Sequence, residues 1–152
     1  MKTRPLVSAA LLLGALTLAG CASPPPPKHP AYLHALTDLR DARWNLEHRA
    51  GDTAVYENED VAVSEIDRAI GEIKRAAFDD NKNLAAHPPE DAHLDRAGRL
   101  HHAAELLRKA RADVDREEDN PQARDLKFRA LDHIALAIQA TERAIAHVEQ
   151  RR

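Results

Sequence analysis

Residues 130–148 read ALDHIALAIQATERAIAHV, with a mostly apolar series of side chains at alternating intervals of three and four. The positions in this series are Leu131, Ile134, Ile138, Thr141, Ile145 and Val148. An α-helix has 3.6 residues per turn, so this spacing places one stripe along one face of a helix. The stretch therefore predicts an amphipathic helix that must bury this face against other elements.

Three further stretches carry the same one-sided pattern. Their stripe positions are Tyr32, Leu36, Leu39 and Leu46; then Val63, Ile66, Ile70, Ile73 and Ala77; and then Leu100, Ala103, Leu107, Ala110 and Val114. The high alanine and charge content and the low glycine content also favour helix. We expect four helices, at about 31–50, 59–78, 90–117 and 121–149.

Polar segments separate these helices. Asn120-Pro121 is typical of an N-cap followed by proline at the first helical position. Asn58, followed by Glu59 and Asp60, predicts a cap and acidic residues at another helix start. The segment 79–90, DDNKNLAAHPPE, ends in a helix-starting Pro-Pro-Glu and is the expected crossover between the two halves of the chain.

The two halves align without a gap when the sequence is shifted by 68 residues. LRDAR, residues 39–43, then falls on LRKAR, residues 107–111, and His34-Ala35 falls on His102-Ala103. Six identities follow in the next helix: Ala62, Ile66, Ala69, Ile70, Arg75 and Ala76 fall on Ala130, Ile134, Ala137, Ile138, Arg143 and Ala144. A register kept across two helices and their turn indicates a duplicated αα-hairpin.

This repeat predicts an all-α fold, a four-helix bundle over residues 31–149 made of two tandem αα-hairpins. The first hairpin is expected at 31–78, the linker at 79–90 and the second hairpin at 90–149. Neither hairpin can bury its stripe alone, but two packed together can. We expect an up-down-up-down arrangement, with Arg40, Arg43, Arg108 and Arg111 facing outward.

The N-terminal segment has the features of a secretory signal peptide. Lys2 and Arg4 precede fifteen residues without a charge, a stretch too short to span a bilayer. Leu18-Ala19-Gly20-Cys21 then resembles the lipobox of bacterial lipoproteins. The alternative is a chance cysteine in an ordinary signal peptide or an uncleaved anchor.

The lipobox resemblance implies that residues 1–20 are removed and that Cys21, the chain's one cysteine, carries palmitate-type acyl chains. Several chains give stable membrane anchoring, whereas one gives only marginal binding. Ala22 follows the cysteine where an Asp would imply retention in the inner membrane, so the resemblance implies the outer membrane, facing the periplasm. Residues 21–30 then form the lipidated cysteine and a proline-rich spacer, and residues 22–30 would reach about 28 Å in an extended polyproline II conformation.

Composition narrows the function of the remaining domain. Without residues 1–20, 20 basic residues stand against 25 acidic ones, and nucleic-acid binding needs basic patches instead. The sequence has no glycine-rich phosphate loop, nucleophile elbow or haem attachment motif. We therefore predict a protein that is not an enzyme and does not bind nucleic acid.

Histidine is the unusual component, with nine in the chain. Imidazole is the commonest neutral metal ligand and suits copper and zinc. RLHHAAELL and RALDHIALAI resemble small periplasmic metal-binding proteins of four-helix form, which implies surface histidines that bind copper and other divalent ions. In an up-down-up-down bundle, one end would collect the predicted metal ligands His34, Asp79, His101, His102, Glu105 and His147.

Two functions thus remain open for the bundle. One is binding or buffering of a transition metal, with copper or zinc as the cofactor. The other is a structural or interaction role, in which charged faces bind an envelope protein partner. A histidine on an exposed helix face is usually hydrated and has no further role.

Overall fold

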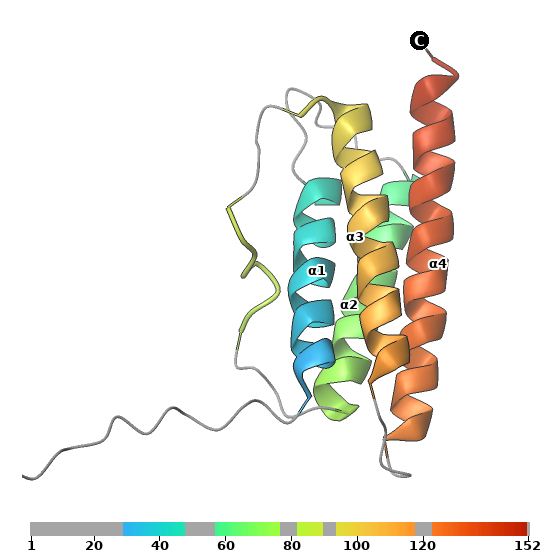
Figure 1. The fold of residues 1–152 in the computed structure, drawn as a ribbon. Helices are drawn as coiled ribbons and strands as arrows, with labels where there is room; N and C mark the ends of the chain where they lie inside the picture. The colour runs from blue at the N-terminus through green and yellow to red at the C-terminus, as the bar shows by residue number, and fades with distance from the viewer. Residues whose placement is uncertain (1–28, 48–56, 77–81, 90–93, 118–122, 152) are drawn as a thin grey trace, which may run out of the picture.

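The computed structural model describes residues 29–47, 57–76, 82–89, 94–117 and 123–151. These residues form four helices, α1 (Pro30–Glu47), α2 (Glu57–Ala76), α3 (Arg96–Arg116) and α4 (Arg124–Glu149), and the described ranges contain no strand (Figure 1). The four helices pack as a bundle, which confirms the predicted fold class.

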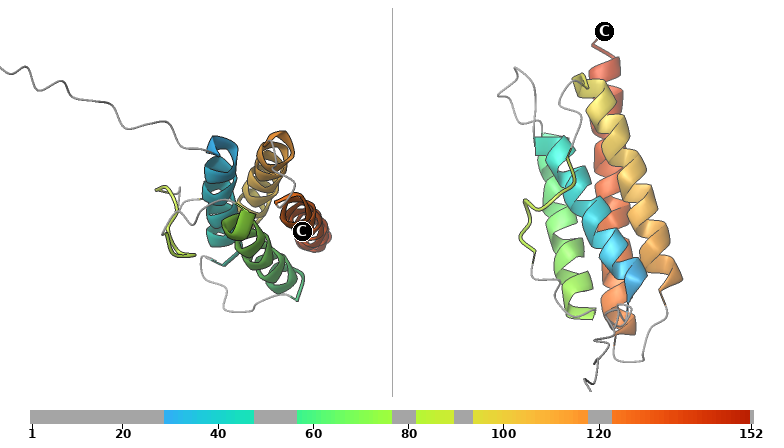
Figure 2. Two further views of the ribbon diagram at one scale, coloured as in Figure 1. Left: turned by 90° about the horizontal axis from the view of Figure 1, so that it is seen from below. Right: turned by 60° about the vertical axis from the view of Figure 1, so that its left-hand side comes forward.

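Each helix has two neighbours in the bundle. α1 packs against α2 and α3, and α4 packs against the same two helices, so α1 lies diagonally opposite α4 (Figure 2). The chain therefore consists of hairpin one, α1 with α2, and hairpin two, α3 with α4. Each hairpin buries its apolar stripes against the other.

The predicted up-down-up-down order is wrong. α1 and α4 run in one direction, and α2 and α3 run in the other, so α3 starts at the same end of the bundle as α2 (Figure 1). The end of α3 accordingly lies beside the start of α1, where the Ala31 amide donates to Glu117 at 3.0 Å. The physical reason is the crossover between α2 and α3, whose described part, residues 82–89, runs along the outside of α1.

The packing relates the two hairpins by an approximate two-fold axis. Shifted by 68 residues, α1 becomes 98–115, which lies within α3, and residues 57–76 of α2 become 125–144, which lie within α4. These repeat partners are the helices that pack antiparallel across the bundle. Glu65 and His133 are 68 residues apart and face each other, with Oε2 and Nδ1 separated by 2.6 Å.

The core consists of the predicted stripes. Ile70 and its repeat partner Ile138 are 2% and 9% exposed. Small buried alanines occupy equivalent positions on α2 and α4, namely Ala62, Ala69, Ala130 and Ala137. The distance between packed helices depends on the side chains at the contact, so alanines allow these two helices to approach closely.

The predicted starts of α3 and α4 need correction. Leu94 and Asp95 are not helical, and α3 begins at Arg96 rather than at 90 because the Asp95 carboxylate accepts from the Gly98 amide at 2.7 Å as an N-cap. α4 begins at Arg124 after Ala123, so Pro121 is not its first residue; Asn120 and Pro121 lie outside the described residues.

The start of α2 differs from the prediction in one respect. Asn58 is the second residue of the helix and not its cap. The acidic residues expected there are present in the first turn, namely Glu57, Glu59 and Asp60. Carboxylates at this position interact favourably with the positive end of the helix dipole.

Candidate functional site

The six predicted metal ligands do not converge. His34 lies near the start of α1 and His102 near the start of α3, and these starts are at opposite ends of the bundle (Figure 1). The reversed direction of α3 separates them. Asp79 falls outside the described residues.

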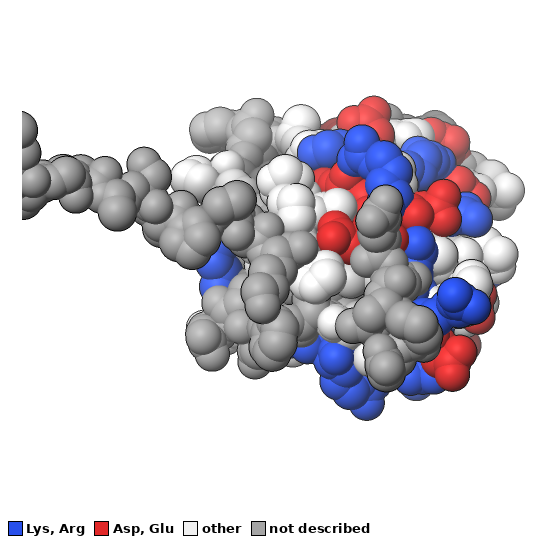
Figure 3. Space-filling model, turned by 60° about the horizontal axis from the view of Figure 1, so that its bottom comes forward, with Lys and Arg blue, Asp and Glu red and all other residues white. Residues whose placement is uncertain are grey.

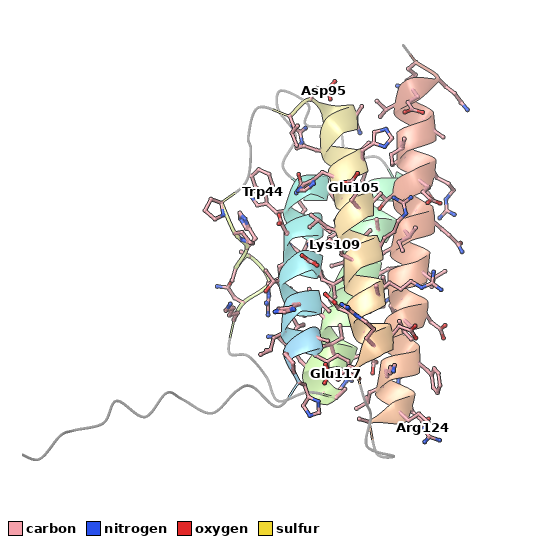
Figure 4. The ribbon with its side chains drawn as sticks, viewed as in Figure 1. Trp44, Asp95, Glu105, Lys109, Glu117 and Arg124 are labelled. Atoms are coloured by element: carbon pink, nitrogen blue, oxygen red, sulfur yellow. The ribbon has the colours of Figure 1, made fainter. Side chains whose placement is uncertain are left out.

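The other four predicted ligands share the far end of the bundle, where α3 starts and α4 ends. His101 Nε2 lies 3.1 Å from Glu149 Oε1 of α4, and both side chains are more than half exposed. Glu105 is exposed one turn further along α3, as Figure 4 shows, and His102 and His147 are half-buried. In the described part of the chain, no three His, Cys, Asp or Glu side chains are grouped to hold a metal ion.

A small cavity of about 190 Å³ lies at the same end, between the starts of α2 and α3 and the end of α4. Its lining includes His147, Glu59 and Arg96. Glu59 is 1% exposed and accepts from Arg96 Nη2 through both carboxylate oxygens, at 2.8 and 2.9 Å, and from Arg96 Nε at 3.2 Å. A buried carboxylate requires such a partner, because desolvation of an unpaired charge is very costly.

The Glu59–Arg96 pair joins the first turns of α2 and α3, helices that do not otherwise pack together. The pair therefore acts as a structural link, and its carboxylate is already engaged. The sequence contains a signal for it, because Glu59 stands four residues, about one turn, before Val63, the first residue of the apolar stripe of α2. A charged residue on a buried stripe predicts a buried ion pair, but not the identity of the partner.

A second hollow is an open groove between α3 and α4, about 400 Å³ in volume. It is lined by Arg108, Arg111, Ala112 and Asp115 of α3 and by Leu131 of α4. Arg108 donates to Glu142 at 2.8 Å. Arg111 is exposed and, within the described ranges, makes no hydrogen bond or ion pair.

Phe128 stands beside this groove. It precedes Leu131 by three residues on α4, so the two side chains are neighbours on the helix surface. Phe128 is 56% exposed, and Leu136, two turns further along α4, is 46% exposed. This surface is not among the sites predicted from the sequence. The signal for it is the position of Phe128, a large apolar residue that lies off the predicted stripe of its helix.

The four arginines that were predicted to face outward differ in exposure. Arg108 and Arg111 are exposed, and Arg43 is half-buried between Glu47 and Asp67, which it binds. Arg40 was expected to face outward but is 1% exposed. Its guanidinium donates to the Leu36 carbonyl at 3.4 Å, so its burial is accompanied by a backbone contact.

Comparison with known proteins gives no family for this chain. No protein-family model matches it, and neither a curated protein nor a solved structure does.

Proposed function

We propose that this protein is a non-enzymatic lipoprotein of the bacterial outer membrane whose helical bundle binds a protein partner in the periplasm. The observation that carries the binding role is the exposed Phe128 beside the groove that contains Arg111. The anchoring role depends on the sequence alone, since residues 1–28 lie outside the described residues.

The lipobox Leu18-Ala19-Gly20-Cys21 and the prolines that follow support the anchoring role. Two or three acyl chains hold a protein stably on a membrane. None of the helices in the described residues has the length and apolar character needed to cross a bilayer. The proline-rich spacer would hold the bundle away from the lipid headgroups.

Phe128 and Arg111 support the binding role because of their chemistry. Aromatic and arginine side chains dominate the energetics of protein interfaces when a partner removes them from water. Phe128 offers an apolar surface, and Arg111 offers a guanidinium that is not already engaged by a described residue. The complementary partner is a protein segment with an apolar side chain next to a carboxylate.

The charges at the end of the bundle where α1 starts do not favour an anionic membrane surface or nucleic acid. Figure 3 shows that end, and acidic and basic side chains of described residues occur side by side on it. A nucleic acid or an anionic lipid surface is attracted by a patch of one sign. A protein partner accommodates mixed charges through individual pairs.

Photo-crosslinking in cells tests the binding role. A photoreactive phenylalanine analogue in place of Phe128 should give one crosslinked product of defined mass, and the analogue in place of Val61, which is 39% exposed on α2, should not. Arg111→Glu should remove the product, whereas Arg68→Glu on α2 should leave it. Crosslinking from position 128 that is no stronger than from position 61 would contradict the proposal.

Mass spectrometry of the N-terminal peptide tests the anchoring role. The mature protein should begin at acylated Cys21, and Cys21→Ser should release it from the membrane fraction. An unmodified Cys21 in a membrane-bound protein would rule out the lipoprotein assignment.

The contact between His101 and Glu149 supports a second candidate function, the binding of copper or zinc. An imidazole nitrogen and a carboxylate oxygen from two helices lie 3.1 Å apart and are accessible to solvent. Both atoms are suitable ligands for these metals. Two ligands are fewer than the four of a structural zinc site, so this pair would give only weak binding.

A further inference from the structure

Most contacts between acidic and basic side chains of the two hairpins have the same polarity. Among the described residues, four have the acid on hairpin one and the basic side chain on hairpin two: Asp38–Lys109 at 3.2 Å, Glu59–Arg96 at 2.8 Å, Glu65–His133 at 2.6 Å and Glu72–Arg129 at 3.1 Å. The pair between His29 and Glu117 has the opposite polarity. In the described contacts, hairpin one thus presents mainly carboxylates to its partner, and hairpin two presents mainly basic side chains.

The carboxylates are the buried members of these pairs. The side chains of Glu59, Glu65 and Glu72 are 1%, 9% and 9% exposed, and that of Asp38 is 14% exposed. Removal of the partner of a buried charge is far more costly than removal of the partner of an exposed one. Glu65 and Glu72 also pair with Arg68 and Arg75 of their own helix. The discrimination between a partner hairpin with basic side chains and one without them therefore depends most on Glu59, which is paired with Arg96.

The approximate two-fold axis also disfavours the pairing of two identical hairpins. Near such an axis, equivalent residues of two identical units meet each other. If two copies of hairpin one paired in this way, Glu65 would face Glu65, and if two copies of hairpin two paired, His133 would face His133. The sequence difference between the two halves therefore favours hairpin one with hairpin two.

The covalent connection does not force the two hairpins of one chain together. The crossover from 77 to 95 has 19 residues and must span the distance between the end of α2 and the start of α3, which is about the 30 Å length of a 20-residue helix such as α2. Nineteen residues in an extended conformation reach about 60 Å. The described part of the crossover touches α1 through His87, whose ring centroid is 5.2 Å from that of Trp44.

We propose that hairpin one can recognise hairpin two of a second copy of this chain through these charged contacts. Hairpin one of each copy then pairs with hairpin two of the other, and the same four contacts between acidic and basic side chains form between chains. This reciprocal dimer has the core of the monomer and differs from it only in the path of the crossover. The proposal is independent of lipid anchoring and of the groove beside Phe128.

Charge reversal in two full-length variants tests the proposal. One variant carries Asp38→Lys and Glu72→Arg, and the other carries Lys109→Asp and Arg129→Glu. Alone, each variant has like charges across its own interface. When the two are unfolded, mixed and refolded, native mass spectrometry from detergent should show a heterodimer at least tenfold more abundant than either homodimer, because reciprocal pairing restores opposite charges.

Two controls distinguish this outcome from nonspecific association and from loss of folding. A single chain with all four substitutions should fold as a monomer with restored helical circular dichroism, because its charges match again. The variants Arg108→Glu and Glu142→Arg reverse a pair that lies within hairpin two, so their mixture should form no heterodimer.

The result that would overturn the proposal is a mixture of the first two variants with no more heterodimer than the mixture of the control variants. If either double variant does not fold alone, the milder pair Glu72→Arg and Arg129→Glu gives the same readout. A failure of the milder mixture to form heterodimer would overturn the proposal equally.

Discussion

Arg40 and Arg108 occupy equivalent positions in the two halves of the chain, but their surroundings differ. Arg40 is 1% exposed, whereas the side chain of Arg108 is 54% exposed and pairs with Glu142. Arg40 lies between Thr37 and Trp44 on one face of α1. That face is covered by the crossover, which contacts Trp44 and lines a hollow with Thr37. The helical pattern alone cannot predict this difference, because the covering segment comes from elsewhere in the chain.

At the same scale, the Glu59–Arg96 pair gives a prediction about stability. Arg96→Ala leaves the carboxylate of Glu59 buried without its cation and should lower the free energy of unfolding by about 3–5 kcal/mol. Chemical denaturation monitored by circular dichroism measures this change.

The matched control for Arg96 is Arg108. Both side chains of its pair with Glu142 are about half exposed, so Arg108→Ala should cost less than about 1 kcal/mol. Equal effects of the two substitutions would show that the Glu59–Arg96 pair is not effectively desolvated.

The helices themselves were largely predictable from the sequence, but the starts of α3 and α4 were not. The stripe residues of all four helices are buried or pack against the core wherever they are described. This agreement follows from local periodicity, which requires no knowledge of the neighbours. The start of α3 differs from the predicted position because Asp95 caps the helix six residues after Pro89. The Pro-Pro-Glu sequence predicted a start at residue 90, whereas the capping residue places it at Arg96.

The cap of α3 gives a prediction at the scale of the element. Asp95→Ala removes the acceptor for the Gly98 amide and should lower the free energy of unfolding by about 1 kcal/mol, within the usual range of 0.5–2 kcal/mol for such caps. Asp95→Ser should retain most of the stability because its hydroxyl can accept the same bond. Denaturation of the two variants should rank them in this order, and indistinguishable stabilities would show that the cap contributes little.

At the scale of the whole molecule, the direction of the helices decides which predicted site residues can act together. The repeat predicted the two hairpins correctly, but it did not determine how one hairpin is oriented relative to the other. That orientation depends on the crossover, whose outer path along α1 is a tertiary feature. His34 and His102 are consequently equivalent in sequence and remote in space.

This arrangement predicts the outcome of a metal-binding double-mutant cycle. His34→Ala and His102→Ala should have additive effects on any affinity for Cu(II) or Zn(II), since the two side chains share no site. His101→Ala should weaken binding more than His34→Ala does, because His101 lies beside Glu149. Isothermal titration at neutral pH measures these affinities, and a coupling above about 0.5 kcal/mol between positions 34 and 102 would contradict the helix directions described above.

The crossover also determines how the molecule would respond to a single cut. Lys82 is exposed in the middle of the chain's path from hairpin one to hairpin two, and a trypsin-like protease cleaves after such a residue. After cleavage, only the first fragment would still contain Cys21, and the second would be retained solely by the buried stripes and ion pairs between the hairpins. The rate at which the second fragment escapes from the membrane would then report the lifetime of that interface.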